Sequence, residues 1–117
     1  MVEKYGLYIH VPFCAQKCYY CDFNSIAIDN ELLASYLKAL QKEIELVAKK
    51  YAPEIRTIYI GGGTPTILSG SQLTTILAKC SNEFNLEEDL EITIEANPGT
   101  LNEKKMELIK QAGVNRL

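Results

Sequence analysis

Three of the four cysteines of the chain, Cys14, Cys18 and Cys21, follow one another with the spacing C-x3-C-x2-C. Three thiolates this close can converge on one metal centre, and soft sulfur ligands select zinc, copper(I) or iron–sulfur clusters. A structural zinc site closes its shell with four protein ligands, whereas a centre held by three keeps one position open for chemistry. The triplet therefore predicts a metal centre, and the ligand count favours an iron–sulfur cluster.

Two other interpretations of the triplet follow from the residues alone. The first residues, Met1 to Tyr5, lack the basic and apolar regions of a secretory signal peptide. We therefore expect a cytoplasmic chain with reduced thiols, which disfavours a disulfide. A zinc site made of the three cysteines and His10 remains an alternative at this point.

A glycine run, Gly61 to Gly63, follows the β-branched and aromatic segment 56–60 and continues as Thr64-Pro65. Consecutive glycines let a backbone approach a ligand closely and adopt positive φ. No Gly-Lys-Ser/Thr follows, so the run is not a P-loop. Taken alone, it is a weak indication of a binding loop.

Glu95 ends a segment, Leu90 to Ala96, in which apolar and polar residues alternate. Such alternation predicts a strand with one apolar face. Glu95 falls at its carboxyl end, where α/β barrels place their chemistry. Taken alone, Glu95 fits a solvated surface carboxylate equally well, as does Glu91.

The chain alternates strand and helix signals, which predicts an α/β fold built from parallel βαβ units. In the first strand, Tyr8 and His10 point away from the apolar side. Every candidate ligand lies at or after the carboxyl end of a strand, so we expect the candidates to share one rim. The expected strands are 5–11, 56–60, 90–96 and a fourth that begins at 114, with helices between them.

Local signals define the ends of two later helices. Ser69 with Gln72, and Thr100 with Glu103, both fit capping boxes. Gly113 fits the residue that ends the third helix. Cys80 falls on the apolar face of the second helix, where we expect a small buried hydrophobe and not a fourth metal ligand.

Composition limits the classes of function. A chain of 117 residues is enough for one small domain, and its net charge of −3 argues against nucleic acid as a partner. No apolar run approaches the ~20 residues of a membrane-spanning helix.

The cysteine triplet, together with the stretches 8–14 and 21–25, resembles the radical S-adenosylmethionine (SAM) superfamily. The branch it resembles contains oxygen-independent coproporphyrinogen III oxidase and the haem chaperones of the HemW family. The resemblance implies that Cys14, Cys18 and Cys21 hold a [4Fe–4S] cluster through three irons. SAM would occupy the fourth iron through its amino and carboxylate groups.

The same resemblance implies a set of SAM contacts. Gly-Gly-Gly-Thr-Pro looks like the family stretch that contacts the amino group of SAM, and Ile94 to Gly99 looks like the strand motif whose glutamate binds SAM. Two tyrosines also match contact positions. The implied SAM-binding residues are Tyr8, Tyr20, Gly62, Gly63, Thr64 and Glu95.

The family fold is a partial (β/α)6 TIM-like barrel with the cluster at the carboxyl rim. Three βα units make only half of it, and an open parallel sheet leaves unpaired edges. We therefore expect residues 1–117 to be the N-terminal part of a radical SAM core domain.

The resemblance leaves two functions open besides a zinc-stabilised α/β module. In the family a reduced cluster passes an electron to SAM, which splits into methionine and a 5′-deoxyadenosyl radical. The oxidases, which act on porphyrinogen, resemble C-x3-C-x2-C-x-C, and Phe23 stands where their fourth cysteine would be. The resemblance therefore favours a haem chaperone, and it implies membrane-bound respiratory haem enzymes as recipients.

Overall fold

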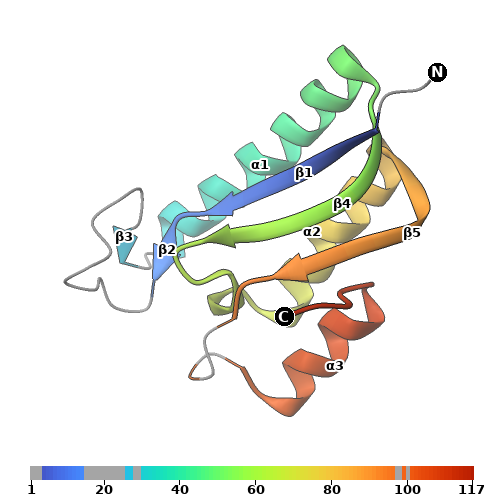
Figure 1. Cartoon of the computed structure of the whole chain (residues 1–117). Coiled ribbons are helices and arrows are strands. Elements are labelled where there is room, and N and C mark those ends of the chain that lie inside the picture. The colour runs from blue at the N-terminus through green and yellow to red at the C-terminus, as the bar shows by residue number, and fades with distance from the viewer. Residues whose placement is uncertain (1–3, 15–25, 28–29, 97–98, 100) are drawn as a thin grey trace.

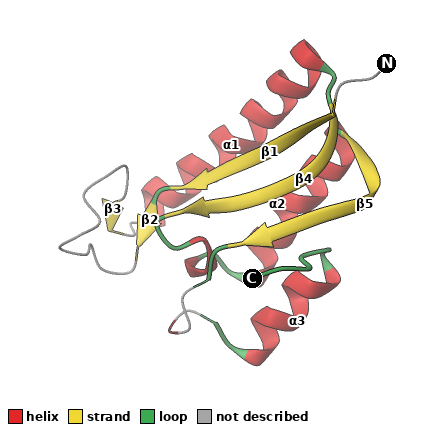
Figure 2. Cartoon of the chain, viewed as in Figure 1, coloured by secondary structure: helices red, strands yellow, loops and turns green. Residues whose placement is uncertain are grey.

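The computed structural model describes residues 4–14, 26–27, 30–96, 99 and 101–117. Figure 2 colours the elements by type. From residue 30 onward, helices and strands alternate along the chain, as expected from the sequence. The elements are β1 (Lys4–Val11), β2 (Phe13–Cys14), β3 (Ile26–Ala27), α1 (Asn30–Tyr51), β4 (Glu54–Gly62), the 3-10 helix η1 (Pro65–Ile67), α2 (Gly70–Glu83), β5 (Asn85–Ile94) and α3 (Glu103–Gln111).

The main sheet has three parallel strands in the order β1-β4-β5. Figure 1 shows α1 and α2 on one face of this sheet and α3 beyond the β5 edge. A second, two-stranded parallel pair joins β2 to β3. The predicted α/β class with parallel strands and outer helices is confirmed.

The core lies between the sheet and its helices. Each strand alternates, so that its apolar side chains enter the core and its polar ones face away. The buried strand residues nearest the carboxyl edge are Ile9, Val11, Ile58, Ile60, Ile92 and Ile94. On the helices, Leu33 and Ile44 of α1, Leu73, Ile76 and Leu77 of α2 and Ile109 of α3 belong to the same cluster.

The outer face of the sheet carries a row of paired residues. Tyr8 pairs with Tyr59, and Tyr59 pairs with Thr93. Two residues nearer the carboxyl edge, His10 pairs with Gly61. Among the described residues no helix covers this face (Figure 1).

The helix ends follow local signals, with one correction. Ser69 and Gln72 form the predicted capping box at α2. At α3 the prediction from Thr100 and Glu103 was wrong, because Asn102 is the N-cap and its side chain accepts the Lys105 N–H at 2.8 Å. Asn102 is as good a cap as threonine and lies directly before the helix.

Gly113 ends α3 as predicted. It has a φ of 116°, its N–H donates to Lys110 O at 3.1 Å, and the Val114 N–H donates to Ile109 O at 3.0 Å. This pair of bonds is the Schellman arrangement, which satisfies carbonyls at the helix end.

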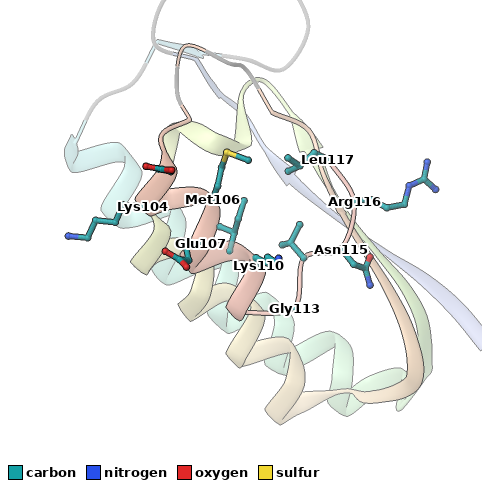
Figure 3. A pocket seen from close by; sticks show the side chains of 11 residues that line it. Lys104, Met106, Glu107, Lys110, Gly113, Asn115, Arg116 and Leu117 are labelled. Carbon is teal, nitrogen blue, oxygen red and sulfur yellow. The ribbon is translucent and has the colours of Figure 1, made fainter.

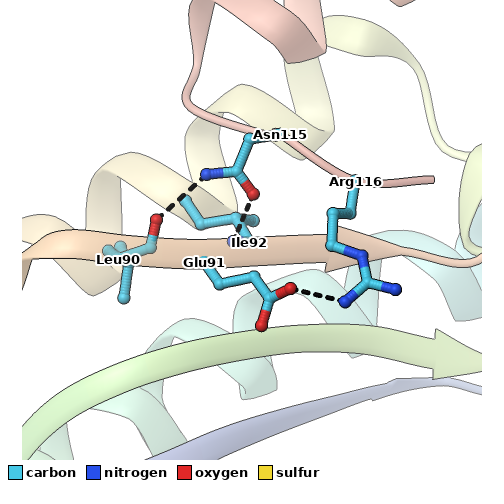
Figure 4. Close-up of polar contacts among 5 residues, drawn as sticks. All are labelled: Leu90, Glu91, Ile92, Asn115 and Arg116. Atoms are coloured by element: carbon cyan, nitrogen blue, oxygen red, sulfur yellow. Dashed lines mark hydrogen bonds and ion pairs between the residues drawn. The ribbon is translucent and has the colours of Figure 1, made fainter.

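The segment after Gly113 pairs with the free edge of β5, as expected for the start of a fourth strand. Arg116 bridges Thr93 in parallel, and its carbonyl accepts the Ile94 N–H at 3.1 Å. Figure 4 shows the Asn115 amide bound to β5: its Oδ1 accepts the Ile92 N–H and its Nδ2 donates to Leu90 O, both at 3.0 Å. The edge is therefore partly closed by a side chain.

A groove of about 1100 Å³ lies between α3 and this last segment, and Figure 3 shows its lining. Met106, Ile109 and Val114 contribute apolar surface, with Glu107 and Lys110 beside them. The lining contains none of the residues predicted to bind a cofactor. Within the described residues, no helix is both long enough and apolar enough to cross a membrane.

Candidate cofactor site

The carboxyl ends of β1, β4 and β5 meet at one edge, because the three strands are parallel. Backbone bonds tie the following loops together there. The Gly63 N–H donates to Val11 O at 2.9 Å, the Thr64 N–H to Phe13 O at 2.8 Å, and the Glu95 N–H to Ile60 O at 2.9 Å. The glycine run, Glu95 and the start of the cysteine segment thus share one rim, as expected from the sequence.

Gly62 holds a conformation that favours glycine. Its φ is 122°, and a Cβ there would lie 2.6 Å from Val11 O and 3.0 Å from the His10 ring. At Gly61 a Cβ would lie 2.7 Å from Glu95 Oε1. Both glycines therefore make room for neighbouring groups, one for a backbone and the other for a carboxylate.

Glu95 is exposed, yet both of its carboxylate oxygens are held. The Gly62 N–H donates to Oε1 and the Tyr59 hydroxyl donates to Oε2, each at 2.9 Å. A carboxylate offers about four acceptor positions, so roughly two remain for a ligand. The contact with Glu95 is also the main reason why the pKa of Tyr59 is raised, followed by desolvation of the phenol.

Tyr8 and His10 extend the polar surface along β1. The Tyr8 hydroxyl lies 3.2 Å from His10 Nδ1, and the rings of Tyr8 and Tyr59 stack with centroids 5.9 Å apart. Tyr8 is 55% exposed, so it faces the uncovered side as predicted. The contact with the Tyr8 hydroxyl gives the His10 ring a hydrogen-bond partner.

The loop after the glycine run is anchored from α3. The Lys105 ammonium donates to the carbonyl of the buried Thr66 at 2.6 Å. Desolvation lowers the pKa of Lys105. This contact holds η1, and with it the end of the glycine run, against the outer helix.

The cysteine triplet is only partly described. The backbone of Cys14 belongs to β2, one residue after Phe13, whose carbonyl accepts the Thr64 N–H. The side chain of Cys14, and Cys18, Tyr20 and Cys21 as a whole, lie outside the described residues. Among the described side chains, no group of three or more His, Cys, Asp or Glu residues could hold a metal.

The donor set nevertheless fits a [4Fe–4S] cluster. Three thiolates in one short segment match the soft ligands that such clusters require. The described backbone places the first of these residues beside the glycine loop. The roles of Cys14, Cys18 and Cys21 as ligands, and of the SAM contacts, remain predictions.

Cys80 lies elsewhere, on the apolar face of α2. It is a free, fully buried cysteine, and burial raises the pKa of its thiol to about 11. The expectation of a small buried hydrophobe is confirmed. Its thiol belongs to the core and not to the rim.

Sequence reasoning did not identify Tyr59. It lies between the buried Ile58 and Ile60, so the alternation of β4 already placed it on the outer face. What the sequence could not supply was the register, which sets Tyr59 opposite Tyr8 on one side and near Glu95 on the other. The register was needed to connect it to the site.

A parallel α/β unit with a glycine loop, a glutamate and the start of a cysteine segment at its carboxyl edge resembles part of a radical SAM protein. The chain belongs to the Radical SAM superfamily, whose family model matches residues 8–117. This confirms the family resemblance seen in the sequence. The family implies a [4Fe–4S] cluster and SAM.

Individual relatives give the same picture. The chain is 46% identical over 112 residues to Heme chaperone HemW of Bacillus subtilis (strain 168), covering 94% of this chain and 30% of the relative. It is 45% identical over 114 residues to Heme chaperone HemW of Escherichia coli (strain K12), covering 96% and 30%. The chain therefore spans about 30% of the length of these relatives.

A solved structure confirms the fold relationship. Coproporphyrinogen III oxidase (HemN) from Escherichia coli, described as a radical SAM enzyme, matches with a TM-score of 0.89 and 33% identity. The match covers 96% of this chain and 26% of that chain. The expected likeness to part of a radical SAM barrel is therefore confirmed.

Proposed function

We propose that the chain is part of a [4Fe–4S]- and SAM-binding haem chaperone that acts in the cytoplasm. Residues 1–117 would form part of its radical SAM core domain. Haem would be its cargo and membrane-bound respiratory haem enzymes its recipients. The names of the relatives that match over most of this chain support the haem-chaperone role in this proposal.

The main support for the proposed binding of the cluster and SAM is the rim that the candidate residues share. The backbone of Gly62, Gly63 and Thr64 lies beside the Glu95 carboxylate and the residue before Cys14. Cys14, Cys18 and Cys21 would hold the cluster, which when bound supplies an electron to SAM. Gly62, Gly63 and Thr64 would bind the amino-acid part of SAM.

Glu95 would accept hydrogen bonds from a ribose hydroxyl or from the ammonium group, since its oxygens keep free acceptor positions. Tyr8 and Tyr20 would complete the contact, Tyr20 through its backbone. The protein's own contribution is thus to bind and orient the cofactors.

Anaerobic reconstitution with iron and sulfide tests the cluster. We expect the chain to take up four irons and turn brown, Cys14→Ala to lose most of the iron, and Cys80→Ala to keep it, because Cys80 lies in the core. A chain that bound one zinc tightly and took up no iron would instead support the zinc-stabilised module.

The second candidate is an oxygen-independent coproporphyrinogen III oxidase, favoured by the match to the oxidase structure. Phe23 counts against it, because the oxidases resemble a pattern with a fourth cysteine at that position. Haem and coproporphyrinogen should be supplied separately to the reconstituted full chain. Stoichiometric haem uptake without porphyrinogen turnover supports the chaperone, whereas turnover supports the oxidase.

A further inference from the structure

Tyr59 is a polar residue at the site to which neither the sequence nor the family comparison gives a role. Its hydroxyl donates to Glu95 Oε2 at 2.9 Å, while the Gly62 N–H holds Oε1 at the same distance. An exposed glutamate normally samples several rotamers, and ordering its side chain costs entropy. Two donors on the two oxygens restrict that freedom before any ligand binds.

The backbone of β4 is built to allow this contact. Gly61 lies between Tyr59 and Gly62, and a Cβ at Gly61 would lie 2.7 Å from Glu95 Oε1 and 2.8 Å from Tyr59 Cε1. A side chain there would therefore displace both partners of the hydrogen bond. Tyr59, Gly61 and Gly62 together form the seat of the carboxylate.

The ring of Tyr59 is itself oriented by its neighbour on β1. It stacks on Tyr8 with an interplanar angle of 19°, and the Tyr8 hydroxyl lies 3.2 Å from His10 Nδ1. Tyr59 remains partly open, at 40% exposure. The stacking on Tyr8 needs only the aromatic ring of Tyr59. Its hydroxyl makes a separate contact with the Glu95 carboxylate, so packing alone does not account for a tyrosine at this position.

We propose that Tyr59 is a positioning residue for the cofactor site: it fixes the Glu95 carboxylate so that its free acceptor positions meet a hydroxyl or ammonium donor of SAM. This inference rests on the proposed function. The raised pKa of Tyr59 agrees with this contact, because the Glu95 carboxylate accepts the phenol proton and so favours the protonated form.

The test measures SAM affinity by calorimetry in the anaerobically reconstituted full chain. Tyr59→Phe keeps the ring and removes only the hydroxyl, and we expect about 2- to 10-fold weaker binding, because part of the side-chain entropy of Glu95 must then be lost on binding. Glu95→Ala should weaken binding about 10- to 100-fold, because it removes charged acceptors. Tyr51→Phe, the same change at an exposed position at the end of α1, should have no effect.

The double variant separates positioning from a merely structural role. In the Glu95→Ala background nothing remains for Tyr59 to position, so Tyr59→Phe should change the affinity by less than about twofold. Wild-type SAM affinity in Tyr59→Phe, or full additivity in the double variant, would overturn the positioning role of Tyr59. The assignment of Glu95 in the proposed function would not be affected by that outcome. Unchanged affinity in Glu95→Ala would overturn both this inference and the assignment of Glu95 in the proposed function.

A measurement without cofactors covers the case in which Tyr59→Phe folds poorly. The pKa of Tyr59 can be followed by NMR of its ring carbons in the wild-type chain and in Glu95→Ala. Loss of the acceptor should lower the pKa of Tyr59 toward its ordinary value. An unchanged pKa would show that the hydrogen bond is absent in solution and would overturn the proposal.

Discussion

The two faces of the sheet are made by the same three strands, but one forms the core and the other forms part of the candidate site. On the covered face, Ile58 and Ile60 are almost fully buried against the helices. On the uncovered face the residue between them, Tyr59, stacks on Tyr8 and binds Glu95. One step along β4 therefore moves from a position that stabilises the fold to a position that shapes a site.

Substitutions on the two faces of the sheet should therefore affect different properties of the protein. Burial of an aliphatic side chain contributes about 1.5–3 kcal/mol, whereas exposed polar contacts contribute little to folding. The covered face should therefore control stability. The uncovered face should control ligand binding with little effect on stability.

Ile58→Ala should have the largest effect on folding. Ile58 is 1% exposed, and removing its buried carbons leaves a cavity, so we expect a loss of about 2–5 kcal/mol in the free energy of unfolding. Tyr59→Phe, one residue away, should lose less than about 1 kcal/mol. Urea unfolding followed by circular dichroism measures both, and equal losses would contradict the division between the faces.

Alkaline pH should destabilise the chain through Tyr36, whose hydroxyl donates to His10 O and whose ring packs edge-on against Phe13. Burial, and then the nearby charges of Glu43 and Tyr8, raise the pKa of Tyr36 from 10.0 to about 12. Below pH 10 both states hold the proton. Between about pH 10 and 12 the unfolded chain loses it first, so stability should fall by about 1–3 kcal/mol.

The matched variant for this effect is Tyr36→Phe, which has no phenol to ionise. Lysines with raised pKa values, such as Lys4 and Lys79, also titrate at alkaline pH. The difference between the two chains isolates Tyr36. If wild type and Tyr36→Phe lost stability in parallel over this window, the shift would be refuted.

Arg116→Gln should have the smallest effect. Its guanidinium binds Glu91 at 2.6 Å on the uncovered face (Figure 4), where the arginine side chain is 66% exposed. Exposed ion pairs contribute about 0–1 kcal/mol and weaken in salt. We expect a loss of that size at low salt and none in molar salt; a larger, salt-independent loss would mean that Arg116 contributes by packing.

Much of the fold could be predicted because the signals were local and repeated. The alternation in Leu7, Ile9 and Val11 gave the buried side of β1, and Ser69 with Gln72 gave the start of α2. Gly113 gave the end of α3, since few other residues adopt positive φ at low cost. The shared rim followed from the order of strands and helices.

Other features could not be predicted, because two residues competed as the helix cap, an acidic run masked the start of a strand, and the strand register is not written in any local pattern. Asn102 and Thr100 are both good caps, and the sequence pattern did not decide between them, whereas in the structure α3 begins directly after Asn102. The acidic run 87–89 hid the early part of β5, which begins at Asn85 and not near Leu90. Tyr59 needed the pairing between strands, which no local pattern contains.

The side-chain amide of Asn115 stands in for a strand backbone at the β5 edge. The backbone N–H of Ile92 donates to this side-chain amide and not to the backbone of a neighbouring strand. Its exchange with deuterium should therefore depend on how often residues 115–117 detach from β5. Slow exchange of the Ile92 amide proton would show that residues 115–117 are attached to the sheet.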